Sequence, residues 1–200
     1  MKPRTVPVAA RLHQLRSQFG QIGIDAFLVT FAPHLRYLSG FSGSSAAGLV
    51  TSRGAVLLTD GRYAGQVRSE VRGWKIAICD DGVLEEIHAR RLLQSGQRVG
   101  FDGNTLTYSQ YRLFKKTFPR VTFCPKVDCI EKIAVVKDET EIANIRKAVG
   151  ITDRVFSEIL GMIKPGVREL DLSAEISYRQ RKYGAEADAF VEVHVSLAGS

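Results

Sequence analysis

Short apolar stretches alternate with segments of helical spacing over residues 8–126, and this alternation constrains the fold more than any other feature. The strand-like stretches are IDAFLVT (24–30), AAGLVTS (46–52), AVLLT (55–59), WKIAIC (74–79), RVGFD (98–102) and VTFC (121–124). The second and third flank Ser52-Arg53-Gly54, which has the length and the glycine of a hairpin turn. The pattern predicts a three-layer α/β/α domain around a mixed sheet of about six strands.

Polar residues at fixed spacing mark where several helices begin. Thr107-x-x-Gln110 is a capping-box pattern for a helix that runs to about Phe118. Asp128-x-x-Glu131 predicts a capped short helix, and Asp138-x-x-Glu141 opens a longer amphipathic one. A helix is also expected over residues 83–94, because apolar residues recur there at helical intervals.

The character of the chain changes near residue 127. Lys164-Pro165-Gly166 ends the long helix, a second helix follows until Gly184, and only one further strand-like stretch remains. Two helices and a strand cannot enclose a core by themselves. We therefore expect a complete domain over residues 1–127, a linker helix over 128–137, and an incomplete second domain over 138–200.

Charge and composition argue against several classes of protein. The 200 residues carry a net charge of +7, but the basic residues are dispersed, so nucleic-acid binding is disfavoured. No stretch approaches the roughly 20 apolar residues of a membrane span, and the N-terminus lacks the apolar core of a signal peptide, so a cytoplasmic location is expected. Cys79, Cys124 and Cys129 lack the spacing of a structural zinc site.

Four aspartates end or precede strand-like stretches and suggest one alternative chemistry. Asp25, Asp60, Asp80 and Asp102 would have to converge to hold two metals as in nucleases of the ribonuclease H type. Asp-Gly at 60, 81 and 102 is also a turn signature, in which the carboxylate accepts backbone N–H groups. The turn interpretation is favoured, and the nuclease stays open as an alternative.

Among the histidines, His34 is the one that we single out as a substrate contact. It follows Pro33 in a segment expected to be a loop, and a surface histidine without a role is the favoured alternative. Gly40, Gly43 and Gly48 do not form a phosphate loop, since neither a Walker lysine nor a G-x-G-x-x-G spacing accompanies them.

Two segments together resemble a known family. RYLSGFSGSSAAGLVTSRGAVLLTDGRYAGQ (36–66) is similar to the first domain of Xaa-Pro aminopeptidases and prolidases. VKDETEIANIRKAVGITDRVFSEILGMIKPGVRELDLSAEI (136–176) resembles the entry into their catalytic pita-bread domain. The resemblance covers the chain to about Phe190 and implies a creatinase-like, ribonuclease H-like N-domain followed by a truncated α+β domain.

The resemblance implies a metallopeptidase that hydrolyses the bond before proline in proline-containing peptides. Family members hold two divalent ions, usually manganese or cobalt, with two Asp, one His and two Glu, and some form homodimers. All five ligands lie beyond the matching segment, and VEVHVSLAGS (191–200) departs from the family pattern. We therefore expect no catalytic residue, metal ligand or cofactor in this chain. It would stop before the residues that carry out catalysis and would be inactive alone.

Asp60-Gly61-Arg62-Tyr63 matches a characteristic motif of the resembled N-domain. By family analogy, Arg62 would reach the active-site mouth of a neighbouring subunit as a substrate-binding residue. The favoured local interpretation has Asp60 capping the next helix and Arg62 pairing with it.

Three further expectations follow from the resemblance. Arg168 replaces the usual capping Thr or Ser, so the helix after it should begin without a side-chain cap. Residues after about Gly184 should be poorly ordered or borrow a partner's surface. The alternative to a truncated enzyme is a non-catalytic interaction or regulatory module of the same fold that pairs with another protein.

Overall fold

The computed structural model describes residues 7–186. They divide into two units, with the boundary between Val136 and Lys137. The expectation for the C-terminal segment concerns mainly residues 187–200, which lie outside the described residues. Within the described part, no helix combines the length and the apolar character needed to cross a bilayer.

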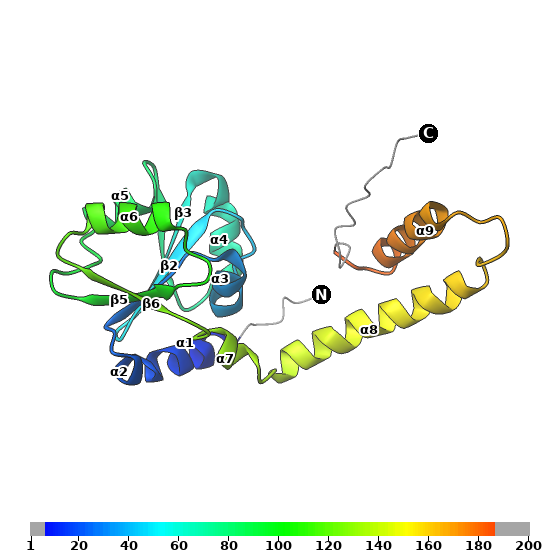
Figure 1. Ribbon diagram of the computed structural model, residues 1–200, viewed down its shortest axis with the longest axis horizontal. Helices are drawn as coiled ribbons and strands as arrows, with labels where there is room; N and C mark the ends of the chain where they lie inside the picture. Colours follow the sequence, from blue (N-terminus) through cyan, green and yellow to red (C-terminus); the bar gives the residue numbers. More distant parts are fainter. Residues whose placement is uncertain (1–6, 187–200) are drawn as a thin grey trace. The chain divides into compact units, whose positions relative to one another are not determined.

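A six-stranded mixed sheet forms the centre of the N-terminal unit (Figure 1). Its strand order is β4-β3-β2-β1-β5-β6. Among these strands β2 alone runs antiparallel to its neighbours, and its register pairs Leu28 with Leu49 and Leu49 with Val56. The expected mixed sheet and its hairpin are confirmed. The strands are β1 (Ala26–Val29), β2 (Ala46–Thr51), β3 (Ala55–Asp60), β4 (Lys75–Cys79), β5 (Arg98–Asp102) and β6 (Thr122–Lys126).

Helices cover both faces of the sheet. One face packs against α1 (Val8–Ser17), α2 (Phe19–Ile22), α3 (Ala32–Ser39), α4 (Ala64–Glu70) and α7 (Glu131–Ala134). The other face packs against α5 (Val83–Ala89) and α6 (Tyr108–Thr117), and Figure 1 shows α5 and α6 on the side of the sheet away from α1. The 3₁₀ helix η1 (Gly61–Tyr63) joins β3 to α4.

Local sequence signals explain where most helices begin and end. Thr107 and Gln110 form the capping box expected for α6, and both the hydroxyl and the amide participate. Three expectations were wrong. The segment around Pro33 is helix rather than loop; α5 ends at Ala89, shortly before Arg91 takes a left-handed φ of 51°; and Asp128, with φ of 57°, provides no side-chain cap for α7.

Gly48 sits where a side chain has no room. A Cβ at this position in β2 would lie 2.8 Å from Leu35 Cδ1 and 2.9 Å from Trp74 Cζ3, both of them core groups.

We expect Gly48→Ala to lower the free energy of unfolding by about 1–3 kcal/mol, because overpacking forces the buried neighbours to move. Urea denaturation followed by circular dichroism measures this. The matched control is Gly65→Ala in α4, where no atom lies within 4 Å of the added methyl group. Equal stability of the two variants would show that the β2 contact is not tight.

The second unit contains α8 (Glu139–Leu160) and α9 (Glu169–Lys182). Asp138 and Glu141 form the expected capping box of α8. As expected, Arg168 gives α9 no side-chain cap, and its guanidinium pairs instead with Asp171 at 2.7 Å.

Little of the second unit is buried within its described residues, 137–186. In α8 only Val155 and Ile159 are enclosed, and α9 contributes no buried residue. Glu158 links the two helices: it accepts from the Tyr183 hydroxyl at 2.8 Å and from Arg179 at 2.6 Å. These hydrogen bonds keep the pKa of Glu158 below its usual value.

Candidate functional site

The chain leaves two neighbouring parallel strands in opposite directions. After β1 it enters α3 on one face of the sheet, and after β5 it proceeds to α6 on the other face. Such a divergence is a topological switch point, and in open α/β sheets ligands bind outside the carboxyl ends of the strands at that point.

His34 lies at this switch point, in the first turn of α3. It is 8% exposed, and the ring of Phe31 meets it edge-on at 4.9 Å. Its Nδ1 lies 3.5 Å from Asp102 Oδ2 and its Nε2 lies 3.3 Å from Glu131 Oε1. The favoured expectation of a surface histidine was wrong, because α3 turns this side chain into the space between β5 and α7.

Asp102 is the last residue of β5 and is held in one orientation. Its Oδ1 accepts the Asn104 backbone N–H at 2.9 Å, and its Oδ2 accepts the Thr105 hydroxyl at 3.0 Å. These contacts agree with the turn role expected for Asp102-Gly103. They also leave the carboxylate, which is only 8% exposed, facing His34.

Glu131 completes the cluster from the first turn of α7, with a side chain that is 44% exposed. No sequence pattern connects Glu131 with His34 or Asp102, since only the pairing of β1 with β5 and the return of the chain to α7 bring the three together. In the described part of the chain, this is the one group of three or more His, Cys, Asp or Glu side chains that could hold a metal ion.

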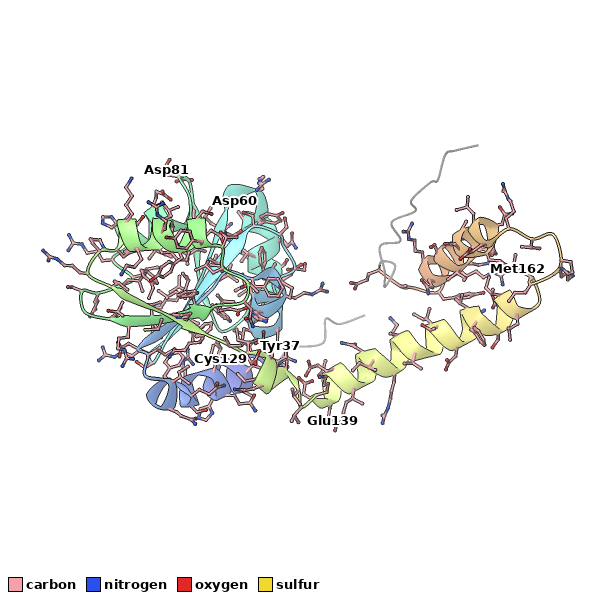
Figure 2. All side chains as sticks on the ribbon, in the orientation of Figure 1. Tyr37, Asp60, Asp81, Cys129, Glu139 and Met162 are labelled. Carbon is pink, nitrogen blue, oxygen red and sulfur yellow. The ribbon has the colours of Figure 1, made fainter. Side chains whose placement is uncertain are left out.

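The Asp60-Gly61-Arg62-Tyr63 motif lies elsewhere on the N-terminal unit. Asp60 Oδ1 accepts the backbone N–H and the Nε–H of Arg62 at 3.0 Å each, while Oδ2 accepts Nη2 at 2.9 Å. Tyr63 shares a hydrogen bond of 2.8 Å with Ser44. Figure 2 places Asp60 well apart from Cys129, which closely precedes Glu131 in the chain. These contacts agree with the expected cap and local pairing.

Arg62 lowers the pKa of Asp60 to about 2 through the side-chain hydrogen bonds, with a smaller contribution from Ser45. The charged form of Asp60 is therefore favoured in the folded state. Its contribution to stability is present above about pH 4, the ordinary range of an aspartate, and is lost as the pH falls toward 2.

We expect Arg62→Gln to raise the pKa of Asp60 toward the ordinary value of about 3.9, because the charged hydrogen bonds are lost. An NMR titration of the side-chain carboxyl carbon of Asp60 measures this. Arg68→Gln, an exposed arginine on α4, serves as the control and should leave the titration unchanged. An unaltered midpoint in Arg62→Gln would mean that the pair does not form in solution.

The four aspartates of the nuclease alternative do not converge. Asp25 precedes β1 and accepts the Arg98 N–H at 2.8 Å. It therefore lies at the amino ends of β1 and β5, whereas Asp102 lies at their carboxyl ends. Asp60 and Asp102 end β3 and β5, which are separated by β2 and β1. Three strand spacings amount to about 14 Å, too far for a shared two-metal centre.

The amino ends of the strands carry an open cavity of about 490 Å³. Asp25 lines this cavity together with five basic or amide residues: Arg53, Lys75, Arg91, Gln94 and Gln97. His34 does not line this cavity, because His34 lies near Asp102 at the carboxyl ends of β1 and β5 and the cavity lies at their amino ends.

Two protein families match successive parts of the chain. Residues 11–136 match the Creatinase/Prolidase N-terminal domain, and residues 143–199 match Metallopeptidase family M24. The uncharacterized peptidase YqhT of Bacillus subtilis is 33% identical over 181 residues, which are 90% of this chain and 51% of that protein. The chain thus spans about half the length of the curated relatives it matches.

Solved structures show the same likeness. The Xaa-Pro dipeptidase from Bacillus anthracis superposes with a TM-score of 0.84 and 32% identity over 92% of this chain and 51% of its own. The N-terminal domain of the cytoplasmic peptidase PepQ from Mycobacterium tuberculosis H37Rv superposes with a TM-score of 0.56 and 31% identity over 62% of this chain and 98% of its own. The chain belongs to the creatinase/prolidase N-terminal domain family and continues into the start of a domain of metallopeptidase family M24.

Proposed function

We propose that this chain supplies the N-terminal half of an Xaa-Pro peptidase, in which the complete enzyme hydrolyses the bond before proline with the help of divalent metal ions. The observation that carries the proposal is the occurrence of both family matches, in order, over about half the length of the relatives. Relatives that are named Xaa-Pro dipeptidases support the choice of substrate.

The described residues of the second unit do not fit the two-metal centre that the family implies. No group of carboxylate, histidine or cysteine ligands gathers between residues 137 and 186. Glu158, the carboxylate that joins α8 to α9, is already engaged by Arg179 and Tyr183. We therefore expect these residues to perform no catalytic step and the chain alone to be catalytically inactive.

An apolar stripe along α8 supports the same proposal. Ile145, Val149, Phe156 and Leu160 recur at helical spacing on one face, and each is between 50% and 63% exposed. A stripe of this kind normally covers a core. In the proposal it is covered by the second half of the peptidase domain, which would also supply the metal ligands.

An activity assay tests the proposal. Three samples are incubated with an Xaa-Pro dipeptide and Mn²⁺ or Co²⁺. They are the purified chain, the chain mixed with the separately produced second half of the Bacillus subtilis relative, and a fusion of the two. Proline release should be absent with the chain alone and present with the fusion. Proline release by the chain alone would contradict its expected inactivity. A folded but inactive fusion would contradict the proposal that the chain is the N-terminal half of an Xaa-Pro peptidase.

The α8 stripe also favours a second candidate, a non-catalytic module that pairs with another protein through this face. The proposed partner is a polypeptide that carries an M24 peptidase domain. Size-exclusion chromatography of the mixture should then show a stable complex without proline release. A strictly monomeric chain that binds no such domain would count against this candidate.

A further inference from the structure

We propose that His34, Asp102 and Glu131 form a binding site for one divalent first-row transition ion, at the carboxyl ends of β1 and β5. The three residues come from α3, β5 and α7, and one ligand atom from each lies within 4.8 Å of the others. A site here lies in the N-terminal unit and goes beyond the proposed peptidase function.

The unsatisfied nitrogen of His34 points to a ligand. Its Nδ1 is enclosed and has no hydrogen-bond partner among the described residues. The separation of 3.5 Å from Asp102 Oδ2 exceeds the 2.7–3.2 Å of an ordinary N–H···O bond. Two ligand atoms that bind one zinc ion tetrahedrally at about 2.1 Å lie about 3.4 Å apart, so the distance suits a shared ion.

The surroundings are prepared for a metal ligand set. Asp102 is fixed by Asn104 and Thr105, which is how outer-shell partners orient a ligating carboxylate. Glu131, with 44% of its side chain exposed, can rotate to complete the set and leaves the remaining position open to water. One imidazole and two carboxylates suit first-row divalent ions such as zinc.

The charges of the cluster also favour a cation. Among the described residues, no lysine or arginine forms an ion pair with Asp102 or Glu131, and an oxygen of each carboxylate lies within 3.5 Å of His34. A divalent ion between them would balance both carboxylates. The competing account is that the two carboxylates contact the imidazole directly, without any metal.

Zinc binding by the intact chain distinguishes the two accounts. The chain is stripped with a chelator and titrated with Zn²⁺ by calorimetry. We expect saturable binding of one ion, with the affinity lowered at least tenfold in His34→Gln and in Asp102→Asn. His13→Gln, which changes an exposed histidine on α1, and Cys124→Ser serve as controls and should bind as the parent does.

Two further measurements separate loss of zinc binding from loss of folding and identify the ligand atoms. Circular dichroism shows whether each variant is folded, and the partly exposed Glu131→Gln provides a variant that is less disruptive to the core. X-ray absorption of the zinc form should show nitrogen and oxygen neighbours without sulfur. Absence of saturable binding, unchanged affinity in folded His34→Gln, or sulfur ligation would each overturn the site.

Discussion

Replacing Phe27 by alanine is expected to lower the free energy of unfolding of the N-terminal unit by about 3–5 kcal/mol. Phe27 is 1% exposed, lies in β1 near the middle of the sheet and belongs to the core beneath α1 and α3. Its ring also lies against Gly100 of β5, where an added Cβ would be 3.0 Å from Phe27 Cδ2. Alanine would therefore leave a cavity that the neighbouring strands cannot easily close.

The measurement uses the single tryptophan of the chain, Trp74, which is 8% exposed and belongs to the same core. Its fluorescence during urea denaturation reports on this unit. The control is Tyr108→Ala on α6, where the side chain is 75% exposed and truncation should change stability by less than about 0.5 kcal/mol. A loss below about 1 kcal/mol in Phe27→Ala would mean that the core around β1 is loosely packed.

The largest expected effect on association is at Phe156. If the second half of the peptidase domain covers the α8 stripe, Phe156→Glu should weaken binding of that half by at least tenfold. Burial of a phenylalanine side chain contributes about 1.5–3 kcal/mol, and each 1.4 kcal/mol is a tenfold change. Burial of an unpaired carboxylate in its place adds a further cost.

Calorimetric titration of the chain with the separately produced second half measures the change. Asn144→Glu is the matched control, because it introduces the same charge at an exposed position of α8 away from the stripe. That variant should bind within about threefold of the parent, well below the tenfold step that 1.4 kcal/mol represents. Equal weakening in both variants would show that net charge, rather than the apolar face, governs the association.

Features determined by neighbouring residues could be predicted from the sequence. The hairpin at Ser52-Arg53-Gly54 and the capping boxes at Thr107 and Asp138 each depend on residues within a few positions of one another. The strands could be predicted because short apolar runs rich in β-branched residues alternate with segments of helical spacing. The failure at Asp128 shows the limit, since the same spacing at a left-handed residue gives no cap.

The cluster around His34 could not be predicted, for a physical reason. Its burial depends on α3, on the parallel pairing of β1 with β5, and on the position of α7, and none of these is encoded near Pro33. Some signal for α3 was present, because Leu35 and Leu38 have helical spacing and Gly40 stands at the end. The partners of His34 still required the tertiary fold.

The pairing of β1 with β5 also determines how late in synthesis the sheet can be completed. β1 and β5 are distant in sequence: Asp25, which directly precedes β1, and Arg98, the first residue of β5, are 73 residues apart. In contrast, β1 and β2 are close in sequence. At 5–20 residues per second, about 4–15 s pass between synthesis of β1 and synthesis of β5. During that interval the nascent sheet has an open edge at β1, which is the kind of edge that other chains can join. In the finished sheet this edge is covered, because β1 lies between β2 and β5.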